Sequence, residues 1–219
     1  SSFTPDELLA DMEQLIKTAN TNCADIMAAF KGADQNKADI EALVAKVEAL
    51  KAELTERELT FSPYDIRFAA VSTGREEFLR LMASDPLTAY TKSETVERAV
   101  EAIETDIENA IKLKDSLKST DKAIADAQAR TDKVRAEGAD YSYGDAQGTD
   151  SSGLPGKNLL NEKGGNPDQP LAQAREHLST CLAHLLAGKL DAAQDEKAKA
   201  ETKAAEAVKL IETVLAARA

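Results

Sequence analysis

The sequence predicts an all-α fold: an elongated antiparallel helical bundle with two long helices, a shorter N-terminal helical hairpin and a long Gly/Pro-rich loop. Apolar residues recur three and four positions apart through most of the chain, which is the period of a helix that buries one face. Only 4% of the 219 residues are aromatic and Trp is absent. The apolar fraction rests on Ala, Leu, Ile and Val, and a core dominated by Ala favours thin seams between close helices because small side chains bury little area each. We therefore expect one elongated domain over 1–219.

The N-terminal hairpin is predicted from two apolar seams separated by a glycine. Its first helix begins at Thr4, an N-cap residue followed by Pro5 and acidic residues, and we expect it to stop at Gly32. Its seam has coiled-coil spacing and comprises Leu9, Met12, Ile16, Ala19, Cys23, Ile26 and Phe30. A second helix, from about residue 34 or 36, carries Ile40, Leu43, Val47, Leu50 and Leu54. The two helices are expected to pack as an antiparallel pair.

The segment 60–92 is predicted to be irregular apart from a short helix over 75–82. Pro63, Gly74 and Pro86 interrupt the apolar pattern there. The segment also holds five of the nine aromatic residues: Phe61, Tyr64, Phe68, Phe78 and Tyr90. We expect these rings to form a local core. A ligand-facing patch is the alternative.

Two long helices are predicted to follow. The first runs from Ser93 to about residue 137 and buries Val96, Val100, Ile103, Ile107, Ala110, Leu117, Ile124 and Val134. The second begins at Pro170 and continues without a break to about residue 217, with Gly188 among its seam residues. Between them, the stretch 138–170 contains seven of the ten glycines and three of the six prolines. That composition predicts a long loop, which is either functional or disordered.

The charge balance bears on the class of partner. With 39 acidic and 27 basic residues the formal net charge is −12, so the surface repels phosphate backbones and we expect no nucleic-acid partner. Charges of both signs alternate along the predicted helices, which is typical of solvated faces with i to i+4 pairs. No stretch reaches the roughly 18 apolar residues that a spanning helix requires. The first residue is Ser1, which is expected of a processed or trimmed chain.

No residue pattern predicts catalysis or cofactor binding. Two histidines on one predicted helix, no strand pattern and no Gly-x-Ser-x-Gly turn leave no set of nucleophile, base and orienting group. The block GLPGKNLLN contains two glycines and a lysine, but it lacks the spacing of a phosphate-binding loop and follows no strand. We therefore expect a protein that is not an enzyme, with no catalytic residue and no cofactor.

The two cysteines, Cys23 and Cys181, allow three interpretations. His177, Cys181 and His184 share one helix face, so with Cys23 they could complete a zinc or copper site, although no paired ligand motif is present and we predict no metal. A Cys23–Cys181 disulfide is the stronger interpretation, because both cysteines occupy seam positions of helices that could be neighbours. Two buried free thiols are the alternative.

Taken together, the Ala and Glu richness, the long antiparallel helices, the loop over 138–170 and the few cysteines resemble the helical surface-coat proteins of trypanosomes. The closest likeness is to the glutamic acid/alanine-rich coat proteins of the insect stage. The likeness lies in composition and architecture, and the family has no motif whose residues transfer to this chain.

The resemblance implies a lipid-anchored coat protein on the extracellular side of the plasma membrane, with the loop over 138–170 at the distal end. Its partners would be neighbouring coat molecules or host and vector ligands. Two alternatives stay open. A ligand-binding surface receptor on the same scaffold would show an exposed apolar patch or a small pocket. An intracellular scaffold or assembly subunit would have reduced cysteines and would bury one helix face against a partner.

Overall fold

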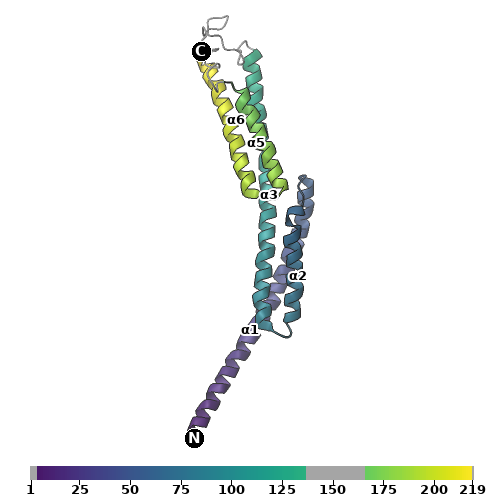
Figure 1. The fold of residues 1–219 in the computed structure, drawn as a ribbon, viewed down its shortest axis with the longest axis vertical. Coiled ribbons are helices and arrows are strands. Elements are labelled where there is room, and N and C mark those ends of the chain that lie inside the picture. The colour runs from purple at the N-terminus through teal and green to yellow at the C-terminus, as the bar shows by residue number, and fades with distance from the viewer. Residues whose placement is uncertain (1–3, 137–165, 219) are drawn as a thin grey trace. The chain divides into compact units, whose positions relative to one another are not determined.

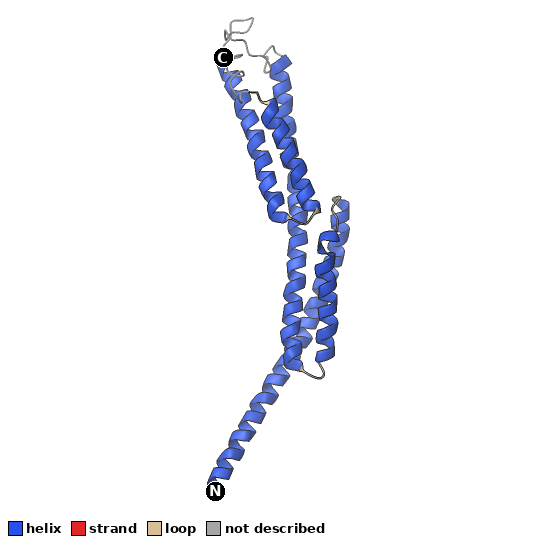
Figure 2. Cartoon of the chain, viewed as in Figure 1, coloured by secondary structure: helices blue, strands red, loops and turns tan. Residues whose placement is uncertain are grey.

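The computed structural model describes residues 4–136 and 166–218, and all regular structure within these ranges is helical (Figure 2). The described ranges contain five α-helices and one short 3-10 helix (Figure 1). They are α1 (Pro5–Glu56), η1 (Ser62–Tyr64), α2 (Asp65–Leu81), α3 (Pro86–Ala136), α5 (Asp168–Leu186) and α6 (Leu190–Arg218). The prediction of an all-α helical bundle is confirmed.

The helices group into two compact units. Unit 1 comprises residues 1–56 and 60–108, and unit 2 comprises residues 57–59 and 109–219. Helix α3 contributes its first part to unit 1 and its second part to unit 2. That the whole chain forms one domain over 1–219 stays a prediction.

Unit 1 is a three-helix bundle of α1, α2 and the first part of α3. The side chain of Asn36 donates a hydrogen bond of 3.0 Å to the Ser93 hydroxyl, and Lys46 pairs with Glu104 further along both helices, so α1 and α3 run parallel. Helix α2 runs in the opposite direction, because Arg67 near its start pairs with Asp106 of α3 at 2.6 Å while Glu77 near its end pairs with Lys92. Arg75 of α2 also pairs with Glu41 of α1 at 2.8 Å. The buried core includes Ala33, Ile40, Val47, Leu54, Val71, Phe78, Val96, Val100 and Ile103.

Gly32 does not end the first helix, so the predicted N-terminal hairpin is wrong. Helix α1 continues through Gly32 for 52 residues, and the two predicted seams lie on one helix. A Cβ atom added at Gly32 would lie 2.6 Å from Cε2 of Tyr90 on α3. The glycine therefore permits a close approach of an aromatic ring rather than a turn.

The boundaries predicted for the next two helices also need correction. Helix α2 spans Asp65–Leu81 instead of 75–82, because Gly74 again lies inside a helix: an added Cβ would be 2.8 Å from Cγ2 of Val96. Helix α3 begins at Pro86, and Ser93 is a buried residue inside it. All eight apolar residues that were predicted to be buried along this helix are buried.

Unit 2 is a second three-helix bundle, made of the remainder of α3 with α5 and α6. Helix α5 runs antiparallel to α3, because Arg135 pairs with Asp168 at 2.6 Å while Arg175 donates to Gln128 at 3.0 Å. Helix α6 runs parallel to α3, because Thr120 donates to Glu201 at 3.0 Å while Arg130 pairs with Glu212 at 3.8 Å. The core is rich in alanine and includes Ile124, Ala127, Leu171, Ala174, Ala204 and Ala207, with a second cluster of Val134, Ile211 and Val214.

The last helix is not continuous, in contrast to the prediction. Helix α5 ends at Leu186 and α6 begins at Leu190, with Gly188 between them at a φ of 69°. The amide of Gly188 donates to the carbonyl of Leu185 and the amide of Lys189 donates to that of His184, which is the Schellman pattern of a helix C-terminus. Gly188 thus provides the left-handed residue that this ending requires instead of a seam position.

Most of the loop predicted over 138–170 lies outside the described residues, and α5 begins at Asp168, two residues before Pro170. Within the described ranges, none of the helices combines the length and the apolar character that crossing a bilayer would require.

Candidate interaction surface

The most unusual surface in the described part of the chain is the N-terminal half of α1. The apolar seam predicted to be buried there is exposed, so that prediction is wrong. Its exposed large apolar side chains are Leu9, Met12, Ile16, Ile26 and Phe30, together with the adjoining Leu8, Leu15 and Met27. We call the seam from Leu9 to Phe30, with these three neighbours, the α1 stripe. In Figure 1 the N-terminal part of α1 extends past the turn that joins α2 to α3.

The α1 stripe lies on the same helix face that the bundle of unit 1 covers. Counting every seventh residue from Met12 gives one line along α1: Met12, Ala19, Ile26, Ala33, Ile40, Val47 and Leu54. The last four residues are buried, whereas the side chains of Met12 and Ile26 are 58% and 42% exposed. The change occurs where α3 begins, because Tyr90 contacts Gly32 one turn into α3. The uncovered stripe is therefore a continuation of a core seam.

A capping box starts this helix. The amide and hydroxyl of Thr4 donate to Oε2 of Glu7 at 2.8 and 2.9 Å, and the amide of Glu7 donates to the Thr4 hydroxyl at 3.4 Å. These bonds lower the pKa of Glu7, the backbone bond having the larger effect. The predicted N-cap at Thr4 is confirmed. Residues 5–28 would extend about 36 Å as a helix, yet they bury almost none of their apolar face.

The aromatic residues of 60–92 are mainly structural. Phe78 is fully buried and Tyr64 nearly so, in agreement with the predicted local core. Phe61 and Phe68 are half-buried and meet edge to face with 5.5 Å between ring centroids. The Nζ atom of Lys51 lies 4.3 Å from one ring centroid and 4.6 Å from the other, so a cation of the chain itself already occupies this aromatic pair.

The two cysteines are free thiols in the structure. Cys23 is exposed on α1 in unit 1, whereas Cys181 is buried in unit 2, where burial raises the pKa of its thiol. The expectation that Cys23 occupies a buried seam is wrong, because that seam is uncovered. The Cys23–Cys181 disulfide receives no support and stays a prediction.

The histidine face of α5 is not arranged as a metal site. Nδ1 of His177 lies 2.6 Å from Oε2 of Glu196 on α6, and Nζ of Lys199 lies 2.6 Å from the other oxygen of that carboxylate. Both bonds lower the pKa of Glu196, that from Lys199 more strongly. Over the two described ranges, no group of three or more His, Cys, Asp or Glu side chains is placed to hold a metal ion.

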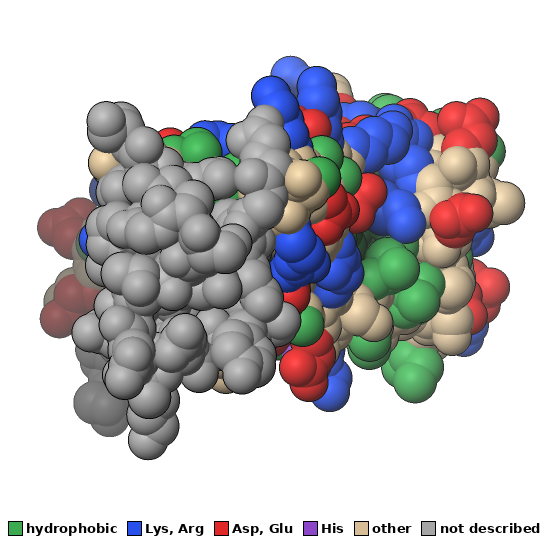
Figure 3. Space-filling model, turned by 90° about the horizontal axis from the view of Figure 1, so that it is seen from above, with side chains coloured by type: hydrophobic (Ala, Val, Ile, Leu, Met, Phe, Trp, Pro, Cys, Tyr) green, Lys and Arg blue, Asp and Glu red, His purple; other side chains and the backbone are tan. Residues whose placement is uncertain are grey.

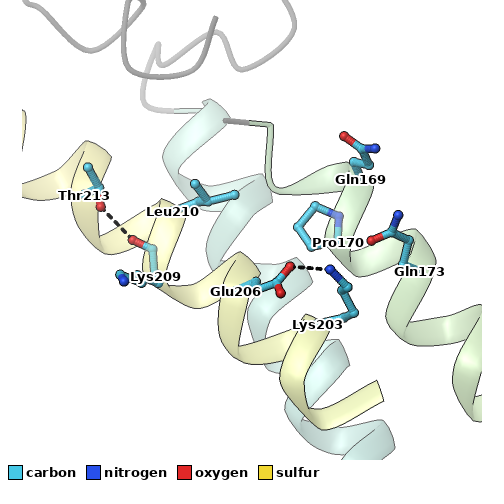
Figure 4. Close-up of a pocket in the computed structure, with 8 residues that line it drawn as sticks. All are labelled: Gln169, Pro170, Gln173, Lys203, Glu206, Lys209, Leu210 and Thr213. Atoms are coloured by element: carbon cyan, nitrogen blue, oxygen red, sulfur yellow. Dashed lines mark hydrogen bonds and ion pairs between the residues drawn. The ribbon is translucent and has the colours of Figure 1, made fainter. Parts of the chain in front are cut away.

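A shallow cavity of about 470 Å³ lies between α5 and α6 (Figure 4). The figure shows Lys203 and Glu206 paired on α6, with 2.7 Å between Nζ and Oε2, and Gln169, Pro170 and Gln173 facing them from α5. The Thr213 hydroxyl donates to the backbone oxygen of Lys209 at 2.9 Å. The polar lining therefore consists of one internal ion pair, two amides, Lys209 and a hydroxyl that is already bonded to its own helix. This set contains no nucleophile next to a base.

Charge elsewhere on the surface is mixed. On the face drawn in Figure 3, Lys and Arg side chains lie beside Asp and Glu side chains. Many are paired within one helix turn, such as Lys199 with Glu196 and Lys197 with Glu201. Such exposed pairs contribute little stability each and are typical of solvated faces.

No protein-family model matches the chain, and neither a curated protein nor a solved structure was found to match it.

Proposed function

We propose that the protein is a non-enzymatic helical assembly subunit that associates through the α1 stripe. The observation that carries this proposal is the uncovered half of the line from Met12 to Leu54. Three heptads of apolar a and d residues predict a coiled-coil partner, because an isolated helix gains stability mainly by packing its apolar face. A contiguous apolar surface of this length on a chain with charged helix faces elsewhere is typical of an interaction site.

The contrast with the cavity between α5 and α6 also supports the α1 stripe as the interaction surface. That cavity is lined mainly by polar side chains, two of which form the Lys203–Glu206 ion pair, whereas the α1 stripe consists of side chains whose apolar atoms have no covering layer in the single chain. A receptor for a small ligand would be expected to bury apolar surface in a concave site. The stripe is convex and extended, which favours a helix as the partner.

The coat function that the resemblance implies, with its lipid anchor and extracellular location, stays a prediction. A coat built from packed helical subunits would also use lateral helix contacts, so the α1 stripe is compatible with a coat as well as with an intracellular scaffold. The observation favours assembly and leaves the compartment open.

Photo-crosslinking in cells that produce the protein tests this proposal. A photoreactive residue at position 16 lies in the stripe, whereas the same residue at Gln14 lies on the opposite side of α1. We expect discrete crosslinked species from position 16 and none from position 14. Equal crosslinking from both positions, or none from either, would show that the stripe is not an assembly surface.

A further inference from the structure

We propose that the occupant of the α1 stripe is the α1 stripe of a second copy of this chain, packed antiparallel over residues 5–30 of both copies. This inference rests on the proposed function and adds the identity and direction of the partner.

The positions beside the stripe permit contact between identical helices. In heptad terms the seam residues occupy a and d, and the flanking e and g positions within residues 5–30 are Asp6, Leu8, Glu13, Leu15, Asn20, Asn22, Met27 and Ala29. Only Asp6 and Glu13 among them are charged, although the chain as a whole is strongly acidic. Two copies therefore meet with little repulsion at the positions that set partner choice in coiled coils.

The end of the stripe selects the antiparallel direction. From Ala33 onwards the same face of α1 is covered by α2 and α3. In a parallel pair, the second α1 would continue along this face beyond residue 30 into the space that α2 and α3 occupy. In an antiparallel pair it ends there instead, because Pro5 of one copy comes level with Phe30 of the other. The exposed N-terminal part of α1 in one copy is therefore long enough to cover the whole stripe of the other copy without reaching its α2 and α3.

The register that gives this overlap also matches the apolar residues. Leu9 faces Ile26 of the second copy, Met12 faces Cys23, and Ile16 faces Ala19. Each layer occurs twice because the pair has two-fold symmetry, and every layer joins an a position to a d position. Large and small side chains alternate across the centre, since each Ile16 meets an alanine.

The distribution of charge favours the same direction. Four of the five acidic residues between positions 5 and 30 lie in the first three turns: Asp6, Glu7, Asp11 and Glu13. A parallel pair would bring both acidic ends together. The antiparallel pair separates them, because in this register Asp6 and Glu7 of one copy come level with Ala29 and Ala28 of the other, and this lowers the repulsion.

Disulfide trapping tests the inference with a native reporter thiol. The background variant Cys181→Ala leaves Cys23 as the one thiol, and Met12→Cys adds its predicted neighbour. Positions 12 and 23 of the same helix are about 16 Å apart, too far for an internal bond. Mild oxidation of the purified double variant is expected to give a disulfide-linked dimer in which mass spectrometry finds position 12 joined to position 23. Gln14→Cys in the same background is the matched control and is expected to give no 14-to-23 link.

Two results would overturn the inference. One is a dominant Cys23-to-Cys23 link in the Cys181→Ala background, which would indicate a parallel pair. The other is a protein that sedimentation shows to be monomeric at every concentration and that forms no 12-to-23 link. In that second case a photo-crosslink from position 16 to a different protein would still support the proposed function, whereas the absence of both would remove it.

A measurement without added cysteines supplies an independent check. Ile16→Lys introduces two charges into every dimer seam, so sedimentation equilibrium is expected to show at least about a hundredfold weaker self-association. Gln14→Lys adds the same charge on the opposite face and is expected to leave self-association unchanged. Equal effects of the two substitutions would contradict the inference.

Discussion

The two halves of α1 carry the same apolar face in different surroundings. From Ala33 to Leu54 that face is buried against α2 and α3, whereas from Leu9 to Phe30 it is exposed over a comparable length. The sequence pattern is continuous across the change, and no break in the helix separates the halves. Heptad spacing therefore indicates that a helix face is suited to packing against a partner. It does not indicate whether that partner belongs to the same chain.

The largest expected effect comes from the same substitution made in each half. Ile40 is fully buried and Ile16 is 58% exposed. At low protein concentration, Ile40→Ala is expected to lower the free energy of unfolding by about 2 to 5 kcal/mol, and Ile16→Ala to change it by about 0.5 kcal/mol or less. Chemical denaturation of both variants checks this difference. Equal losses would mean that residues 5–28 are packed within the single chain.

The boundary between the halves should respond to a change at Gly32. Alanine is a better helix former by about 1 kcal/mol, but its Cβ would collide with the ring of Tyr90. We expect Gly32→Ala to destabilise unit 1 by about 1 to 3 kcal/mol in the native background. In a Tyr90→Ala background the same substitution should become neutral or stabilising. A cost that persists without the ring would show that the close approach is not the reason for the glycine.

The smallest expected effect is that of low pH on the capping box at the N-terminus of α1. Hydrogen bonds from Thr4 lower the pKa of Glu7 below its ordinary value of 4.5. A carboxylate with a lowered pKa in the folded state stabilises the fold above its unfolded pKa, and this stabilisation is lost as the pH falls through the folded pKa. The N-terminal turn of α1 should therefore loosen only below about pH 4.5. Carbon NMR titration of the Glu7 carboxyl checks the direction, and an unshifted titration would contradict the capping geometry. Thr4→Ala should return the pKa of Glu7 towards its ordinary value.

The sequence predicted the helical class and the buried residues of α3 correctly, because periodicity depends only on side-chain polarity. Three of the errors in the predicted helix boundaries share a single physical reason. Gly32 and Gly74 were interpreted as breaks but allow close contacts with Tyr90 and Val96, whereas Gly188 was placed in a seam but ends α5 with a positive φ. A glycine serves both purposes, and the neighbour or the dihedral angle that decides between them is a property of the tertiary structure.

The candidate site could be found only in part from the sequence. Leu9 to Phe30 were recognised as a coiled-coil seam, but burial within a hairpin was expected because Gly32 suggested a second helix folding back. The wrong expectation that Cys23 is buried has the same origin. The pairing of His177 with Glu196 could not be predicted either, because the two residues were expected on one continuous helix. They lie on α5 and α6, which are separated at Gly188.

Amide hydrogen exchange at several protein concentrations tests the central claim most directly, because it reports on both halves of α1 in one experiment. We expect protection over residues 5–28 to rise with protein concentration while protection over residues 33–54 stays constant, since a second copy covers the first segment and α2 and α3 cover the second. Protection over 5–28 that does not depend on concentration would contradict it.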